Sequence, residues 1–279
     1  MRLMTKLTLA ASALIASVIM APLAAANKPV DGNIGFQEPA TIVMQELVKF
    51  HNQVFILISA IVVFVTVLMG WIMFRYSAKR NPVPSKTTHH VGLEIAWTII
   101  PILALLWMVF PSMKNLYLQD RLPETELTIK VTGNTWNWTY EYPELEDKVE
   151  GFTSYLLPEE EAKAQGRSYL LAADTPLVVP VDTNVKVLVT SSANLHAFAV
   201  PAFGVKIDAV PGRINQTWFN VFKEGTFYGQ CSELCGKDHA FMPIEVKVVS
   251  KAEFKRWVDN GGQFATKQAM VDGAAVSVE

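Results

Sequence analysis

The two cysteines of this 279-residue chain stand four positions apart, in the stretch GQCSELCGKDHAFMP at residues 229–243. After Cys231, the sequence places Cys235, His239 and Met242 at intervals of four, four and three residues. Thiolate, imidazole and thioether together form a soft donor set that suits copper. The spacing and chemistry of these side chains therefore predict a copper site.

Two other interpretations of the cysteine pair remain open at this point. Exported cysteines usually form a disulfide, but a bridge across so short a loop would constrain the unfolded chain little, because the entropic gain grows with loop length. Zinc is the rival metal, although structural zinc sites rarely include a thioether such as that of Met242. His196, on a separate β segment, offers one more imidazole to either metal.

The first residues of the chain have the pattern of an export signal. Arg2 and Lys6 precede a short apolar run, which ends in three alanines at residues 24–26. Basic start, apolar core and small residues, in this order, are typical of a secretory signal peptide. We predict a signal peptide at residues 1–26, with cleavage after Ala26.

Two longer apolar runs, at residues 54–74 and 95–113, contain no Asp, Glu, Lys or Arg. Each reaches the roughly 20 residues that a helix needs to cross the ~30 Å hydrocarbon core of a bilayer. Lipid offers backbone groups no other partner, so both runs are predicted to be helical. We expect transmembrane helices at about 52–74 and 93–113, within a membrane region that spans residues 27–119.

The loop between these runs fixes the expected orientation. It carries Arg75, Lys79, Arg80 and Lys86 and no acidic residue. Positively charged loops favour the cytoplasmic side. Both termini, and everything from Asp120 onward, are therefore expected on the periplasmic side of a bacterial inner membrane.

The exported part is acidic and rich in β patterns. From Asp120 onward it contains 22 Asp and Glu against 15 Lys and Arg, a net charge of −7, which would attract a basic partner or simply keep the domain soluble. Segments that alternate apolar and polar residues or are rich in β-branched ones lie at 126–133, 135–142, 176–181, 184–191, 196–201, 216–221, 225–230 and 244–249. Many short strands at regular spacing predict an antiparallel sandwich or barrel.

Three further features complete the exported part. Ser250 and Glu253 form a capping box that predicts a short helix through Trp257. The acidic stretch at 144–167 is predicted to be an inserted loop, and residues 261–279 are expected to be a disordered tail. The sequence contains no nucleotide-binding glycine motif, and no nucleic-acid partner is expected.

The stretch CSELCGKDHAFM, together with the His196 segment, the two apolar runs and the β-rich domain, resembles subunit II of haem-copper cytochrome c oxidases. The resemblance covers nearly the whole mature chain. It implies a two-helix transmembrane hairpin followed by an all-β, cupredoxin-like Greek-key barrel at residues 120–260, which holds a binuclear copper A centre.

The resemblance also implies a ligand set. Cys231 and Cys235 would bridge both coppers, while His196 and His239 would each bind one. Met242 would be a weak axial ligand, and the backbone carbonyl of Glu233 would be the other.

Three more roles follow from the same resemblance. The stretch GNTWNWTYEYP is similar to an aromatic stretch of the family in which the first tryptophan, here Trp136, receives the electron from cytochrome c. Without the resemblance, a tryptophan in a strand would indicate a core residue.

The side chain of Glu233 would share a magnesium ion with the catalytic subunit, although an acid here can equally face solvent. Glu94 matches a glutamate at the cytoplasmic mouth of a proton path, but an acid in the first turn of a helix is also favoured by the helix dipole.

One departure concerns the docking surface. Family members often place acids just before the Leu-His or Ile-His of the first copper ligand, where this chain has Ala193 and Asn194. Glu146 and Asp147 match another acidic run, and the domain remains negative. The resemblance thus leaves open which cytochrome binds.

The resemblance predicts the subunit of a respiratory oxidase that passes single electrons from a c-type cytochrome to haem in catalytic subunit I, which reduces oxygen to water. Other oxidase subunits and membrane lipid are further expected partners. Two alternatives are a membrane-tethered copper-delivery factor and a copper-free quinol oxidase subunit II. Such delivery factors usually have one membrane helix and early cysteines in a thioredoxin-like fold, whereas quinol oxidase subunits lack the copper ligands.

Overall fold

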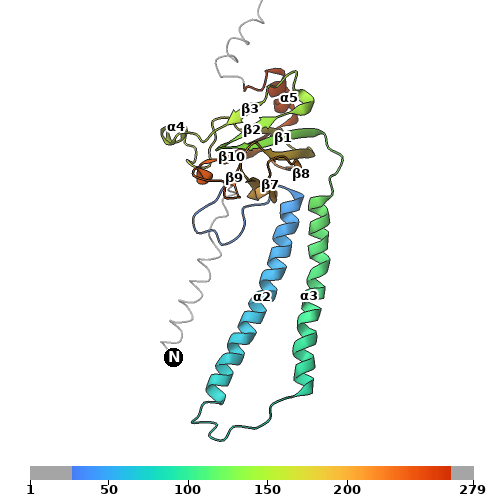
Figure 1. Cartoon of the computed structure of the whole chain (residues 1–279), viewed down its shortest axis with the longest axis vertical. Helices are drawn as coiled ribbons and strands as arrows, with labels where there is room; N and C mark the ends of the chain where they lie inside the picture. The colour runs from blue at the N-terminus through green and yellow to red at the C-terminus, as the bar shows by residue number, and fades with distance from the viewer. Residues whose placement is uncertain (1–26, 265–279) are drawn as a thin grey trace, which may run out of the picture.

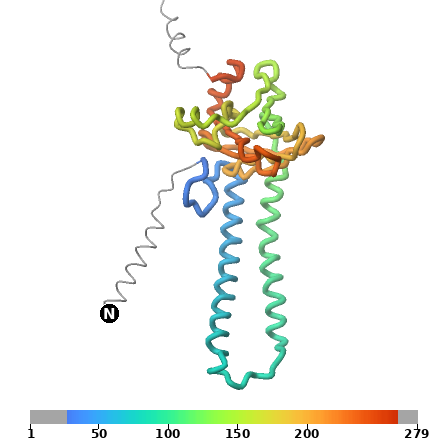
Figure 2. Tube along the Cα trace, turned by 60° about the vertical axis from the view of Figure 1, so that its left-hand side comes forward, coloured from blue at the N-terminus to red at the C-terminus, as the bar shows by residue number. Residues whose placement is uncertain are grey.

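The computed structural model describes residues 27–264 and consists of two long helices that carry a β domain at one end (Figures 1 and 2). The predicted signal peptide, residues 1–26, lies outside the described residues. The same holds for residues 265–279 of the predicted disordered tail.

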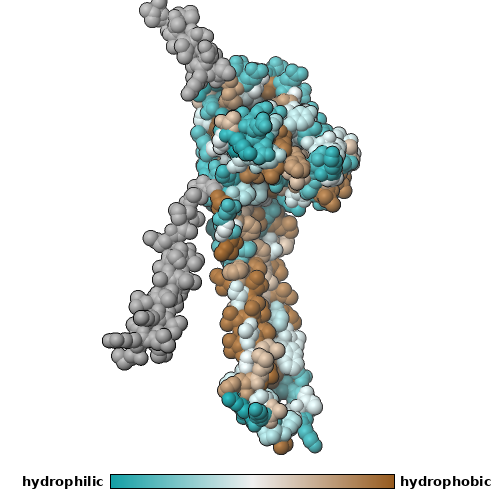
Figure 3. Space-filling view, turned by 90° about the vertical axis from the view of Figure 1, so that its left-hand side faces the viewer, coloured by the Kyte–Doolittle hydropathy of each residue, from teal (hydrophilic) through white to brown (hydrophobic). Residues whose placement is uncertain are grey.

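The two helices are α2 (Ile42–Arg75) and α3 (Val91–Asp120), and both are long and apolar enough to cross a membrane. Their apolar side chains cover the stalk below the domain in the space-filling view (Figure 3). Each helix begins before its apolar run, at a first turn that a side chain caps: Thr41 accepts a hydrogen bond from the Met44 N–H, and His90 accepts one from the Leu93 N–H.

Polar contacts join the helices to each other and to the domain at one end. The Thr41 hydroxyl donates to the Phe203 carbonyl at 2.7 Å, which fixes the start of α2 against the domain. The Glu46 carboxylate of α2 pairs with the Lys114 ammonium of α3 at 2.6 Å. The helices are therefore closest at their domain end and lie further apart toward the connecting loop (Figure 1).

The domain contains two sheets of five strands each, with strand orders β3-β2-β1-β5-β8 and β4-β10-β9-β6-β7. In chain order the strands are β1 (Leu127–Asn134), β2 (Asn137–Glu141), β3 (Phe152–Ser154), β4 (Leu177–Pro180), β5 (Val185–Ser191), β6 (His196–Val200), β7 (Val205–Ala209), β8 (Asn215–Phe219), β9 (Gly225–Cys231) and β10 (Pro243–Val249). In β1 and β5, buried and half-buried residues alternate strictly, as the sequence pattern predicts. The inward-facing side chains build an aromatic core between the sheets that includes Trp138, Tyr142, Phe198, Phe203 and Phe227.

The predicted fold class is confirmed: a pair of long apolar helices is followed by an all-β, cupredoxin-like domain. Six of the eight strand pairs in the described residues are antiparallel, as predicted, but two are parallel. β1 pairs in parallel with β5, and β10 pairs in parallel with β4. Parallel partners need a long crossover connection, and β1 and β5 are separated by three strands and a short helix.

The acidic stretch at 144–167 is more ordered than the predicted inserted loop. It contains β3, which extends the first sheet, and the short helix α4 (Glu159–Ala164). Its end is fixed to β10 by an ion pair between Arg167 and the buried Glu245. After β10, the Ser250 hydroxyl accepts from the Glu253 N–H at 3.1 Å, and the predicted helix forms as α5 (Lys251–Asp259).

Candidate metal centre

Three chain segments meet at one end of the two sheets to form the candidate metal centre. The first residue of β6 is His196, and the last residue of β9 is Cys231. The loop from β9 to β10 then supplies Cys235, His239 and Met242. The last of these precedes β10 directly, so regular strands hold both ends of the loop.

The predicted donor atoms converge in this arrangement. Cys231 Sγ lies 3.7 Å from His196 Nδ1 and 3.8 Å from Cys235 Sγ. Cys235 Sγ lies 3.4 Å from His239 Nδ1 and 3.6 Å from Met242 Sδ. The Glu233 carbonyl oxygen is 3.3 Å from Cys231 Sγ. All six predicted ligand residues are thus brought to one place.

The sulfur geometry fits a shared metal. Both cysteines are free thiols, and their 3.8 Å separation far exceeds the ~2 Å of a disulfide bond. It is also less than twice the ~2.3 Å of a metal–thiolate bond, so a metal ion on either side of the sulfur–sulfur line can contact both. Even without the other donors, three buried residues could hold a metal ion, because their donor atoms lie within 4.8 Å of one another: His196, Cys231 and Cys235.

Burial favours the uncharged form of two of these groups. Burial, and then the neighbouring Cys231, raises the pKa of the Cys235 thiol to about 12, so a bound metal must displace its proton. Burial, and then the charge of His239, lowers the pKa of His196 below its ordinary value of 6.5. This shift favours the neutral imidazole, which is the form that binds metals.

The ring of His196 packs against a glycine that the motif does not include. A Cβ atom added at Gly133, near the end of β1, would lie 2.9 Å from His196 Cδ2 and 3.0 Å from its Cγ. Both contacts are shorter than packed carbon atoms allow, so Gly133 must lack a side chain for His196 to keep its place. Gly133 is therefore part of the support of the metal centre.

We expect Gly133→Ala to lower the copper affinity of the full chain by about 10- to 100-fold, the usual cost of disturbing the support of a ligand. The added methyl group forces the His196 ring away from Cys231. Copper titration monitored by the visible spectrum measures the effect. The control is Gly35→Ala, where an added Cβ meets nothing within 4 Å; equal copper affinity in the two variants would contradict this role of Gly133.

Trp136 lies directly beside the copper loop. Its indole Nε1 donates to the Cys235 carbonyl at 3.2 Å. Its ring also covers Gly236, where an added Cβ would come within 3.1 Å of Trp136 Cζ2, and where φ is +123°. Both the backbone conformation and the close approach favour glycine at position 236.

The other predicted residues lie at a distance from the buried donors or at the surface. The side chain of Glu233 is exposed. Glu94 is at the opposite end of the helices, where its carboxylate accepts from the His90 N–H at 3.1 Å; this is a capping contact in the first turn of α3. Ala193 and Asn194 lie in the exposed turn between β5 and β6.

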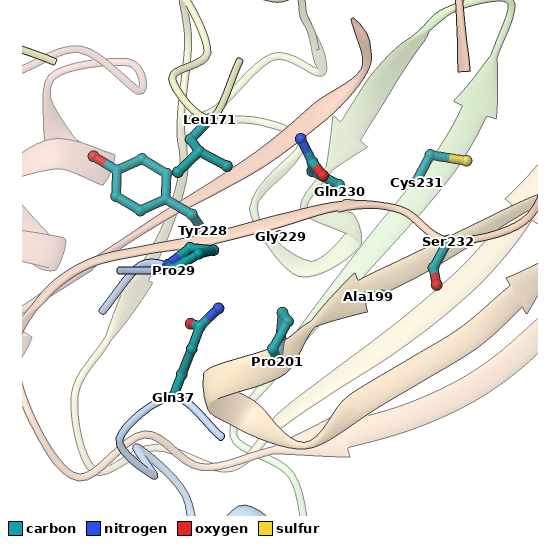
Figure 4. A pocket seen from close by; sticks show the side chains of 10 residues that line it. All are labelled: Pro29, Gln37, Leu171, Ala199, Pro201, Tyr228, Gly229, Gln230, Cys231 and Ser232. Atoms are coloured by element: carbon teal, nitrogen blue, oxygen red, sulfur yellow. The ribbon is translucent and has the colours of Figure 1, made fainter. Parts of the chain in front are cut away.

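A hollow of about 210 Å³ lies next to the candidate metal centre and has Cys231 among its lining residues. Its lining includes Gln37, Pro201, Tyr228 and Gln230, and Cys231 stands at its edge with the sulfur pointing away from Gln37 and Tyr228 (Figure 4). The other five ligand residues are not among those that line the hollow.

Sequence motifs alone do not indicate three residues at this site: Gly133, Asn194 as a hydrogen-bond donor, and Gly236. The Asn194 side-chain amide donates to the Cys235 carbonyl at 3.0 Å. The sequence does offer a clue to the two glycines, because Gly133 opens the stretch GNTWNWTYEYP and Gly236 lies within CSELCGKDHAFM. Nothing in the sequence pairs Asn194 with Cys235, because the two are 41 residues apart.

Comparison with known proteins agrees with this architecture. The chain matches the family model of the cytochrome c oxidase subunit II periplasmic domain over residues 127–249 and that of the subunit II transmembrane domain over residues 29–115. A probable cytochrome c oxidase subunit 2 of Rickettsia felis is 46% identical over 246 residues, which are 88% of this chain and 77% of that protein.

Two further similarities concern other bacteria. Cytochrome c oxidase subunit 2 of Cereibacter sphaeroides is 42% identical over 273 residues, covering 91% of this chain and 89% of that protein. The crystal structure of the periplasmic domain of cytochrome oxidase subunit II of Bradyrhizobium japonicum shares 51% identity and a TM-score of 0.46, covering 50% of this chain and 96% of that one. By the family models and the identity along most of its length, the chain belongs to the cytochrome c oxidase subunit II family.

Proposed function

We propose that this chain is the electron-entry subunit of a respiratory cytochrome c oxidase. It takes single electrons from a c-type cytochrome at a binuclear copper A centre and passes them to haem in catalytic subunit I, where oxygen is reduced to water. The observation that carries this proposal is the convergence of two free thiols, two imidazoles and a thioether from one loop and the ends of two neighbouring strands.

The chemistry of the donors supports a pair of coppers rather than one zinc. When bound, the copper pair supplies a carrier for one electron at a time. Cys231 and Cys235 would bridge the pair, since their sulfurs are close enough to share metals. His196 and His239 would each complete one side, with Met242 and the Glu233 carbonyl as weak axial donors.

The surroundings of the donors support fast electron transfer. Cys231, Cys235, His196 and Met242 are all at most 6% exposed, and strands hold both ends of the loop. A rigid, water-poor site keeps the ligands in nearly the same positions in both oxidation states. Burial and hydrogen bonds around ligands are also what tunes a metal's reduction potential.

Trp136 would be the point at which the electron enters. Its indole lies at the protein surface, half-buried, and its N–H donates to the Cys235 carbonyl. This contact links a surface aromatic ring to the backbone of a copper ligand. The net charge of −7 on the exported part supports docking of a basic cytochrome.

Two carboxylates are assigned to roles that need the partner subunits. The exposed side chain of Glu233 would bind a magnesium ion shared with catalytic subunit I. Glu94 would stand at the cytoplasmic mouth of a proton path, in the first turn of α3. This role requires the basic loop at residues 75–90 to face the cytoplasm of a bacterium, with both termini and the copper domain in the periplasm.

The two alternative functions fit less well. Family membership and the cupredoxin-like domain disagree with a thioredoxin-like copper-delivery factor. A copper-free quinol oxidase subunit II would lack the donor set, whereas here each predicted donor is present and faces the others.

We expect Met242→Leu to leave copper bound and to raise the reduction potential of the centre. Leucine fills a similar volume, so the fold should lose less than about 1.5 kcal/mol, but the thioether no longer donates to the oxidised metal. A spectroscopic redox titration measures the potential. The matched control is Met44→Leu, a buried methionine at the start of α2, and an unchanged potential in the Met242 variant would contradict axial ligation.

The proposed function is tested by rapid mixing of the copper-loaded full chain, in detergent, with a reduced c-type cytochrome. Oxidation of the cytochrome should coincide with bleaching of the copper spectrum, one electron per chain. Copper that stays oxidised in the presence of reduced cytochrome would reject electron entry. Extraction of the untagged complex in mild detergent, followed by a haem spectrum, tests the association with catalytic subunit I.

A further inference from the structure

We propose that Asn194 is a positioning residue for the copper loop, acting through the backbone carbonyl of Cys235. This inference rests on the proposed copper site and extends it to a side chain outside the ligand motif. The geometry that points to this role is that the Cys235 carbonyl oxygen accepts hydrogen bonds from two separate segments, those of Trp136 and Asn194.

The Cys235 carbonyl oxygen accepts two side-chain hydrogen bonds. Trp136 Nε1 approaches at 3.2 Å from the turn between β1 and β2. Asn194 Nδ2 approaches at 3.0 Å from the turn between β5 and β6. A carbonyl oxygen has two lone pairs, so these two donors satisfy it completely and fix its position from two directions.

The turn that carries Asn194 is itself held in place. The Ala193 N–H donates to the Ser191 hydroxyl at 3.3 Å, and this hydroxyl also lies against the Asn194 carbonyl. The Ser192 N–H donates to the Gly133 carbonyl at 3.0 Å. Ser191 is buried and Gly133 packs on His196. These contacts therefore hold the backbone of Asn194 in a fixed position.

The hydrogen bond from Asn194 to Cys235 therefore links the residues that position two ligands, His196 and Cys235. The turn is anchored at Gly133, beside His196, and its side-chain amide reaches Cys235 in the other ligand segment. A displacement of the copper loop would have to break the Asn194 bond as well as the Trp136 bond. Asn194 thus limits movement of Cys235 relative to both His196 and Trp136.

The chemistry of the side chain is specific to an amide. Within an amide side chain only the NH₂ group donates, and the Asn194 nitrogen is the atom that faces the Cys235 carbonyl. An ionised carboxylate at this position accepts hydrogen bonds and donates none. Asn194→Asp therefore removes the bond with almost no change in shape, and Asn194→Ala removes it with no change in charge.

Two measurements on the full chain in detergent test the proposal. Loss of one hydrogen bond should make amide exchange across residues 232–241 about two- to twelvefold faster in both Asn194 variants. The N–H dipole also stabilises the electron-richer reduced centre, so Asn194→Ala should lower the reduction potential of the copper-loaded protein. A residue that only stabilised the fold would leave the potential unchanged.

Ala193→Asp is the matched control, because it adds the same charge one residue away and keeps the Asn194 amide. Its exchange in residues 232–241 should equal that of the unmodified chain. The proposal is overturned if Asn194→Ala keeps the original potential, or if Asn194→Asp exchanges no faster than Ala193→Asp. Failure of the unmodified chain to bind two coppers would instead reject the proposed function, so the two failures are distinguishable.

Discussion

Cys235→Ser is expected to destroy the binuclear centre and abolish electron entry. The Cys235 sulfur lies between the Cys231 sulfur, His239 Nδ1 and Met242 Sδ, each within 3.8 Å. Replacing it with a hydroxyl removes the sulfur that lies beside all three of these donor atoms. We expect the variant to bind fewer than two coppers per chain and to lose the mixed-valence spectrum.

The control for this substitution is Ser232→Ala. Ser232 is an exposed neighbour of the ligands, and its backbone N–H, which the substitution keeps, donates to the Ala197 carbonyl at 3.0 Å. Copper content by elemental analysis and the visible spectrum should match the unmodified chain in this control. Unchanged copper content and spectrum in Cys235→Ser would refute thiolate bridging.

Trp136→Phe is expected to slow electron entry while the copper spectrum stays intact. Phenylalanine keeps an aromatic ring beside Gly236 but loses the N–H that donates to the Cys235 carbonyl. The substitution removes a hydrogen bond worth about 1 kcal/mol, and the smaller ring reduces contact with the loop further, so we expect the rate to fall several-fold. Rapid mixing with saturating reduced cytochrome measures the rate.

Trp71→Phe provides the comparison, because Trp71 lies on α2 and is 56% exposed there. This variant should be reduced at the original rate. An undiminished rate in Trp136→Phe would reject Trp136 as the entry point, while an altered copper spectrum would show that the substitution had disturbed the ligands instead.

The elements that the sequence predicted well are those encoded by local patterns. The membrane helices follow from uninterrupted apolar runs, and β1 and β5 follow from strict alternation. The donor set in the copper loop was also predictable, because four of its side chains lie within twelve residues of each other along the chain. Chain connectivity alone holds such residues near one another.

The features that were missed depend on contacts between distant segments. The parallel pairing of β1 with β5 joins residues such as Leu127 and Val185, and no local pattern specifies the partner of a strand. Gly133 matters only because His196 packs on it, and Asn194 only because Cys235 lies beside it. Tertiary packing determines these contacts, so a single sequence does not reveal them.

The proposed electron entry depends on two ionised sulfurs, those of Cys231 and Cys235, that jointly hold a pair of coppers. The most direct measurement combines copper analysis with the visible and electron paramagnetic resonance spectra of the metal-loaded full chain. We expect two coppers per chain and one unpaired electron shared between them. A single bound copper, or a disulfide between Cys231 and Cys235 in the fully loaded protein, would contradict it.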